Sequence, residues 1–249
     1  MLGQEVEADA SFTRAQLDVT DRDAVGAALG PDDLVINCAA WTDVDGAEGH
    51  EDEALRVNRD GARNVAEAAG AVVYVSTDYV FDGSKSEPYL PSDPVNPLSA
   101  YGRTKLAGEE ATAQANPRHF IARSSWLFGN GGPNFVATML RLGEENDSVR
   151  VVDDQIGKPT YTPHLAAALV GLAQSDDYGI HHLAASGQCS WFEFAREIFA
   201  GAGLDTRVEP CSTAEFPRPA RRPANSVLGG GPPLPDWREG LEAYLGIRV

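Results

Sequence analysis

The fold class is decided by residues 51–81, EDEALRVNRDGARNVAEAAGAVVYVSTDYVF, in which a helical pattern runs directly into a buried strand. Over 51–70 the small and apolar residues recur with helical spacing, and Gly70 is a suitable C-terminal stop. Residues 71–81 form an apolar run that is typical of a fully buried strand. A helix followed at once by a buried strand favours a parallel sheet covered by helices.

The same alternation continues along the chain. Further strands are predicted at 32–40, 119–129, 149–155 and 179–185, and further helices at 99–115, 134–145, 162–174 and 190–203. This order predicts an α/β protein with a Rossmann-like, doubly wound parallel sheet. The pattern changes near residue 155, and 215–237 is a Pro- and Gly-rich segment that we expect to be mostly loop. We therefore expect a Rossmann domain over 1–155 and, over 156–249, mainly a small C-terminal lobe that closes over a substrate.

Small and polar side chains follow three of the predicted strands. In a parallel sheet with right-handed crossovers, the ligand crevice lies at the carboxyl ends of the strands. The residues predicted to line it are Ala39, Ala40, Trp41 and Thr42 after one strand, Ser76, Thr77 and Asp78 after the next, and Ser124, Ser125 and Trp126 after the third. Their convergence follows from topology and does not depend on a single motif.

The composition limits the partners and the compartment. A formal net charge of −17 disfavours binding to nucleic acid and to anionic membranes. No apolar run approaches the ~20 residues needed to cross a bilayer, and no export signal is visible. The three cysteines show no CxxC spacing, which argues against disulfides and a structural zinc site. We expect a cytoplasmic protein that binds neither nucleic acid nor membrane.

Tyr101 and Lys105 stand four residues apart in the predicted helix 99–115, so their side chains lie on one face. Lysine is rare here, with three lysines against seventeen arginines. An ammonium beside a phenol stabilises the phenolate and lowers the tyrosine pKa toward neutrality. Lysine also offers a compact charge with three donors, which the wide fork of arginine does not replace. The pair is consistent with an acid–base site, although alone it is also typical of a solvated helix face.

Several ordered strings make the pattern more specific. They are VINCAAWTDVDGAE, VNRDGARNVAEAA, VYVSTDYVFDG, SAYGRTKLAGE, RSSWLFG, NFVATMLRL and VVDDQIGKPT, with a weaker echo in RPARRPANSVL. Together with Thr77, Tyr101 and Lys105 they resemble the extended short-chain dehydrogenase/reductase family and, within it, the dTDP-4-dehydrorhamnose reductases. The resemblance runs from the first residues to about residue 190.

The resemblance implies that NADPH or NADH reduces the C4 ketone of a dTDP-4-dehydro-6-deoxy sugar to give dTDP-L-rhamnose. In that scheme Tyr101 donates the proton, Lys105 holds the nicotinamide ribose and lowers the Tyr101 pKa, and Thr77 binds the sugar oxygen. Asp78 and Trp126 are implied substrate contacts, with Trp126 either stacked on thymine or a core tryptophan. Independently of the resemblance, Arg221 and Arg222 stand in a Pro-rich loop from which they could reach the diphosphate as charge-assisted donors. The implied cofactor-binding residues are Met1, Leu2, Asp18, Val19, Ala39, Ala40, Trp41, Thr42, Tyr101 and Lys105.

Related activities and assembly states stay open at this point. The similar nucleotide-sugar dehydratases carry Thr-Asp-Glu after this strand, whereas Tyr79 stands in the third position here, which favours simple reduction over dehydration. A non-catalytic, regulatory homologue and a nucleotide-sugar epimerase are the alternatives. The sequence decides neither between NADH and NADPH, nor between monomer and homodimer, nor whether magnesium lies at a dimer interface.

The beginning of the chain departs from the family pattern. Relatives open with a strand and a GxxGxxG turn that holds the pyrophosphate, whereas this chain opens with MLGQEV, similar to the tail of that turn with Gly3 as its last glycine. We therefore expect the first strand to be missing and its neighbours to lack a partner. A misassigned start is favoured over truncation or a genuine short form. The remnant of the second-strand region is expected within 7–25.

Overall fold

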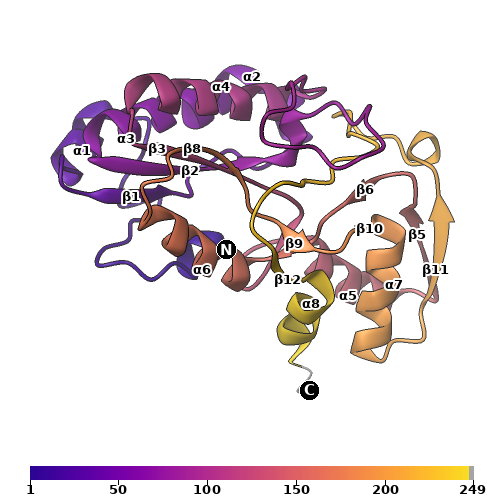
Figure 1. The fold of residues 1–249 in the computed structure, drawn as a ribbon. Helices are drawn as coiled ribbons and strands as arrows, with labels where there is room; N and C mark the ends of the chain where they lie inside the picture. Colours follow the sequence, from indigo (N-terminus) through magenta and orange to yellow (C-terminus); the bar gives the residue numbers. More distant parts are fainter. Residues whose placement is uncertain (247–249) are drawn as a thin grey trace.

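The computed structural model describes residues 1–246, and at its centre lies a four-stranded sheet (Figure 1). Its strands follow the order β1, β2, β3, β8, and every neighbouring pair is parallel. The register pairs Leu34 with Ala71, Val72 with His119, and Phe120 with Gly179. The strand bounds are β1 Leu34–Asn37, β2 Ala71–Thr77, β3 His119–Ser124 and β8 Gly179–His182.

Helices cover both faces of this sheet, which confirms the predicted doubly wound α/β fold. Alternate residues of a strand point to opposite faces. Val72 packs in one cluster with Val25 and Val65, whereas Val73 packs in another with Leu165. The helices concerned are α1 Arg22–Ala28, α2 Glu51–Leu55, α3 Ala62–Ala68 and α4 Ala100–Ala115 on the first side, with a π-helical segment Arg56–Gly61 between α2 and α3, and α6 Thr162–Ala173 on the other.

A second apolar cluster lies beside the sheet and is built by α5, β5, α7, β11 and α8. Strand β5 pairs in parallel with β11. Helix α7 has well-marked ends, because Ser190 and Glu193 form a capping box and Gly203 takes the left-handed conformation. The bounds are α5 Phe135–Glu145, β5 Ser148–Val152, α7 Trp191–Ala202, β11 Arg207–Cys211 and α8 Trp237–Leu245.

The predicted boundary between two domains at residue 155 stays a prediction. The chain passes between the sheet and the second apolar cluster more than once, so residue 155 does not divide them cleanly. Strand β8 and helix α6 follow that boundary yet belong to the sheet, whereas α5 and β5 precede it and belong to the second cluster. Helices α1 and α8 and strand β11 were not predicted. Helix α1 spans seven residues and includes Gly26, so its pattern is short and weak.

Several expected strands are shorter than predicted because the chain turns at the crevice. Over 71–81 the strand ends at Thr77 and a 3-10 turn follows, and over 119–129 and 179–185 a break separates two short strands. The remaining short elements are η1 Leu2–Gln4, η2 Gly46–Glu48, η4 Asp78–Val80, β4 Leu127–Phe128, β6 Ile156–Gly157, β7 Thr160–Tyr161, β9 Ala185–Ser186, β10 Cys189–Ser190, η5 Thr213–Glu215 and β12 Leu234–Asp236.

One edge of the sheet is formed by β1. Within residues 1–246, β1 pairs with β2 alone, and Leu34 on it is 46% exposed. The expected remnant of the second strand is not formed. Residues 7–21 contain no strand, and residues 22–25 belong to helix α1. Among residues 1–246, no helix has the length and apolar character that a membrane span requires.

Candidate active site

The end of β2 and the start of α4 lie close together where the sequence predicted a ligand site. Ser99 caps α4, with its hydroxyl accepting a 3.1 Å hydrogen bond from the amide of Gly102. The Ala100 amide donates to Glu48 at 2.8 Å, which ties the helix to the loop after β1. A Cβ on Gly102 would lie 2.3 Å from the Tyr79 carbonyl oxygen. Only glycine therefore lets the helix begin this close to the end of β2.

Tyr101 lies in the first turn of α4 and packs with Trp41 on a small cluster of alanines. Its ring meets the ring of Tyr79 edge-on, with centroids 6.0 Å apart. Burial raises the pKa of Tyr101 to about 12; a hydrogen bond with Thr77 acts to lower it and the charge of Asp78 to raise it. The structure thus brings Tyr101, Thr77 and Asp78 together at the end of β2.

Lys105 is fully enclosed one helical turn further along α4. Its amine donates a 2.7 Å hydrogen bond to the Val75 carbonyl and lies 4.0 Å from the centroid of the Tyr74 ring. Burial lowers the pKa of Lys105 to about 7, with the charges of Glu109 and Cys38 opposing. An ammonium has three donors, so two stay available for a ligand.

The expected effect of Lys105 on Tyr101 is not what the structure shows. The Tyr101 pKa moves upward, because loss of solvent around the buried phenol dominates and the hydrogen bond with Thr77 does not offset it. The phenol therefore keeps its proton at neutral pH, which is the form that a proton donor needs.

Beneath Lys105 lies a buried ion pair that the sequence analysis missed. Both carboxylate oxygens of Glu109 accept from Arg123, at 2.9 and 2.7 Å, and Glu109 also accepts from the Ser76 hydroxyl at 2.5 Å. Glu109 is four residues after Lys105, so spacing on the helix was the one signal available for it. The pair places a negative charge beside the buried amine.

Asn58 explains why a polar residue occupies the packed side of the helix at 51–70. It lies within the π-helical segment and is completely buried. Its side chain accepts from the Trp41 amide at 2.8 Å and donates to the Thr104 hydroxyl at 2.9 Å. Asn58 thereby fixes the loop after β1 against α4, and so sets Trp41 relative to Tyr101.

Asp78 is a buried carboxylic acid at the centre of the site. Oδ1 accepts from the Thr77 hydroxyl at 3.0 Å, while Oδ2 has no hydrogen-bond partner among residues 1–246. Burial raises the pKa of Asp78 to about 7, although the hydrogen bond from the Thr77 hydroxyl opposes that shift. A buried oxygen without a partner is available to a polar ligand.

Trp126, between β3 and β4, has an unusual backbone conformation, with φ at +49°. Its indole stacks on Trp191, with centroids 3.6 Å apart and an interplanar angle of 6°. Gly157 also approaches this indole, since a Cβ there would lie 2.3 Å from it. Stacking of Trp126 on thymine therefore stays a prediction, and its known partner is another tryptophan.

The predicted cofactor-binding residues divide into two groups. Ala39, Ala40, Trp41 and Thr42 follow β1 and adjoin Tyr101 through Trp41, as expected for one wall of a crevice. The others lie elsewhere: Leu2 is buried in the cluster under α6, the Met1 amine donates to the Gly131 carbonyl at 3.4 Å, Asp18 accepts from Thr20, and Val19 packs beside Gly61. No described contact joins these four residues to Tyr101.

The two arginines expected at a diphosphate differ in their surroundings. Arg221 is exposed, whereas Arg222 is partly buried and pairs with Asp45. All three cysteines are free thiols. Residues 1–246 bring together no group of three or more side chains suited to holding a metal ion.

Comparison with known proteins gives a consistent result. The family model described as the RmlD substrate binding domain matches residues 2–247. The chain is 42% identical to a dTDP-4-dehydrorhamnose reductase from Sinorhizobium fredii over 91% of this chain and 84% of the relative, and 43% identical to one from Mycolicibacterium smegmatis over 93% and 76%. A crystal structure of a Bacillus anthracis dTDP-4-dehydrorhamnose reductase in complex with NADP is similar with a TM-score of 0.90 and 40% identity, covering 95% of this chain and 89% of that one.

Proposed function

This chain belongs to the RmlD substrate binding domain family, and from that premise we propose that it reduces the C4 ketone of dTDP-4-dehydrorhamnose to give dTDP-L-rhamnose. It is an oxidoreductase, and its reductant is a nicotinamide cofactor. The observation that carries the proposal is the juxtaposition of a Tyr101 phenol, a Thr77 hydroxyl and a buried Lys105 amine at the end of β2. These are the groups that a carbonyl reductase needs.

Tyr101 is the proposed proton donor. Its raised pKa keeps the phenol protonated until negative charge develops on the sugar oxygen. The alkoxide of a secondary alcohol is more basic than a phenolate, so transfer of the proton is favourable. The Thr77 hydroxyl, next to the phenol, is the proposed second donor to the same oxygen. Its single proton would turn from Asp78 Oδ1 to the sugar oxygen when the substrate binds.

The residues around Lys105 fit a nicotinamide ribose. The amine has two unused donors in a buried position, and the loop 39–42 forms the neighbouring wall. When bound, the reduced nicotinamide supplies the hydride. We propose NADPH as the first cofactor to test, since the Bacillus anthracis relative was crystallised with NADP.

Asp78 and Trp126 are the proposed contacts to the substrate. The unpartnered Oδ2 of Asp78 suits a sugar hydroxyl, and its raised pKa lets the acid donate or accept. Tyr79 fills the position of the acid that a dehydratase would need, and its ring instead abuts Tyr101. That replacement favours reduction without dehydration.

The proposed setting is the cytoplasm, with a free nucleotide sugar as the substrate. The three free thiols suit a reducing compartment. The net charge of −17 opposes binding to nucleic acid or to an anionic membrane, so neither is proposed as a partner.

The test follows NADPH and NADH oxidation with dTDP-4-dehydrorhamnose as the substrate and identifies the product by NMR. We expect dTDP-L-rhamnose, and Tyr101→Phe is expected to lower kcat by about 100-fold or more because the proton donor is lost. Tyr244→Phe, in the second apolar cluster, is the matched control. Full turnover by Tyr101→Phe, or a dehydrated product, would defeat the assignment.

A further inference from the structure

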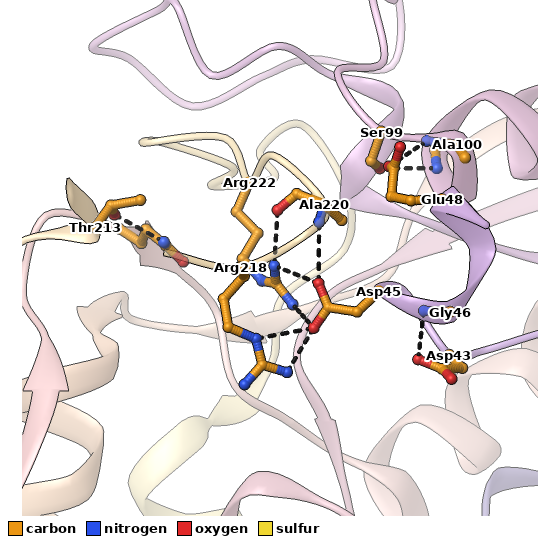
Figure 2. Close-up of polar contacts among 12 residues, drawn as sticks. Asp43, Asp45, Gly46, Glu48, Ser99, Ala100, Thr213, Arg218, Ala220 and Arg222 are labelled. Atoms are coloured by element: carbon orange, nitrogen blue, oxygen red, sulfur yellow. Dashed lines mark hydrogen bonds and ion pairs between the residues drawn. The ribbon is translucent and has the colours of Figure 1, made fainter. Parts of the chain in front are cut away.

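Asp45 collects donors from a segment that lies more than 170 residues away in sequence (Figure 2). It stands in the loop after β1, at the start of η2. Arg218 donates to Oδ2 through Nε at 2.9 Å and through Nη2, and Arg222 donates to Oδ1 and Oδ2 at 3.0 Å each. The backbone amide of Ala220 completes the set at 3.1 Å. One carboxylate thus holds five donors.

These donors belong to residues 216–224, FPRPARRPA, which we name the arginine loop. On the N-terminal side of the loop, Thr213 donates hydrogen bonds to Asp154 and accepts one from Gln155, just after β5. On the C-terminal side of the loop, the Ser226 amide donates a hydrogen bond to the Ile156 carbonyl. Between 217 and 222, every ion pair to another part of the described chain goes to Asp45.

The Asp45 side of this contact is rigid. Asp43 accepts from the Gly46 amide at 2.9 Å and closes the turn, and Glu48 at the end of η2 accepts from Ala100 at the start of α4 (Figure 2). The loop that carries Asp45 is therefore fixed to the helix that carries Tyr101. Through Asp45, the arginine loop is therefore linked to the start of the helix that carries Tyr101.

On the side of the arginine loop, Arg222 lies close to the proposed active site. Arg222 lies beside the phenol of Tyr79 and interacts with it, and Tyr79 in turn stands edge-on to Tyr101. A single side chain hence separates the arginine loop from the proposed proton donor. Opening of the loop would therefore move Arg222 away from Tyr79.

The charges favour a closed loop across the working pH range. Burial raises the pKa of Asp45, but the hydrogen bonds from Arg222 and Arg218 outweigh it and hold that pKa well below its usual range. Asp45 is therefore ionised at neutral pH. Without its charge, two guanidinium groups would face each other with no anion between them.

We propose that Asp45 is a positioning residue that holds the arginine loop closed over the reductase site by binding Arg218, Ala220 and Arg222 together. The inference rests on the proposed function for its kinetic consequence alone. The closure itself is a property of the folded chain and has its own readout.

Limited trypsin digestion measures loop opening directly. Arg218 and Arg222 are each followed by proline, which blocks trypsin, so Arg221–Arg222 is the one cleavable bond in the arginine loop. Because cleavage tracks the population of the open form, we expect Asp45→Asn to raise the initial rate at this bond by about tenfold. Mass spectrometry of the early fragments identifies the bond. Asp45→Glu, which keeps the charge, is expected to restore most of the protection.

The matched control breaks a similar ion pair between α2 and α4. Glu51 accepts two hydrogen bonds from Arg103, at 2.8 and 2.7 Å, and within residues 1–246 it has no hydrogen bond or ion pair to the arginine loop. Glu51→Gln is expected to leave cleavage at Arg221–Arg222 unchanged. Arg218→Gln removes one of the two arginines from an exposed position and is expected to give an intermediate rate, which covers the case that Asp45→Asn fails to fold.

Kinetics test the consequence for the site. We expect Asp45→Asn to raise KM for the nucleotide sugar by about tenfold with a smaller change in kcat, because the chemistry is intact and the closed form is rarer. Equal cleavage rates in Asp45→Asn and the unaltered protein would overturn the proposal. Faster cleavage with an unchanged KM would overturn the link to the site. If the unaltered protein fails to reduce the sugar, the proposed function falls while the digestion still decides the loop.

Discussion

The Lys105 amine donates a 2.7 Å hydrogen bond to the carbonyl of Val75, two residues before Thr77 on the same strand. This contact ties α4 to β2 at the height of the site. The lysine is thus held at a buried position, where burial destabilises its charged form.

Replacing Lys105 by methionine should stabilise the fold in a pH-dependent way. The folded-state pKa of about 7 lies below the unfolded value of 10.5, so the unfolded chain binds more protons between these values. Stability of the unaltered protein therefore rises with pH across this window, and the cost of the buried charge is complete below it. We expect Lys105→Met to gain on the order of 2 kcal/mol at about pH 6 and much less at about pH 10.

Urea unfolding at the two pH values measures this effect. Lys85→Met is the control, because the Lys85 amine lies near the surface and pairs with Asp93. A gain from Lys105→Met that is equal at both pH values would contradict the assignment of a buried, charge-destabilised amine.

Removing one partner of the buried Glu109–Arg123 pair should be costly. Glu109→Gln leaves the Arg123 guanidinium, which is 2% exposed, without its counter-charge, and we expect a loss of about 3–5 kcal/mol. The double variant Glu109→Gln with Arg123→Met removes both charges and should recover much of that loss. A double-mutant cycle from urea denaturation gives the coupling, and strictly additive losses would show that the pair is not coupled.

Much of this site was predictable because it depends on local signals. Ser99 and Pro117 delimit α4, and the ends of β1 and β2 place Trp41, Thr77 and Asp78 at one edge of the sheet. The Glu109–Arg123 pair and the Asp45 contacts were not predictable, since no local pattern joins residues on different elements. The upward shift of the Tyr101 pKa depends on burial, which spacing along a helix does not report.

Asp78 should show the opposite pH dependence to Lys105. Its folded-state pKa of about 7 lies above the ordinary value of 3.8, so the folded chain binds the extra proton between these values and stability falls as pH rises through the window. Asp78→Asn cannot lose a proton, so its stability relative to the unaltered protein should increase from about pH 4 to about pH 8. Asp82→Asn is the control, because hydrogen bonds from Asn96 and Ser84 hold the Asp82 pKa below its usual range. If the stability of Asp78→Asn relative to the unaltered protein does not change with pH, burial does not destabilise the charged form of this carboxyl.

Gly102→Ala should disturb the site although it adds one methyl group. The new Cβ would lie 2.3 Å from the Tyr79 carbonyl oxygen and 2.9 Å from the Pro97 side chain, and a backbone carbonyl cannot move aside by a rotamer change. The start of α4 must shift instead, which moves the adjacent Tyr101. We expect a loss of about 1–3 kcal/mol in stability and a fall in kcat of about tenfold or more, because misplacing a catalytic group by a fraction of an ångström is costly.

Gly171→Ala is the matched control for this substitution. Gly171 lies within α6, and a Cβ there would meet nothing within 4 Å. The change should stabilise the protein by about 0.5–1 kcal/mol, since alanine favours the helix over glycine. Thermal unfolding and the reductase assay measure both variants. Equal activity in Gly102→Ala and Gly171→Ala would mean that the close approach of α4 to Tyr79 does not set the position of the phenol.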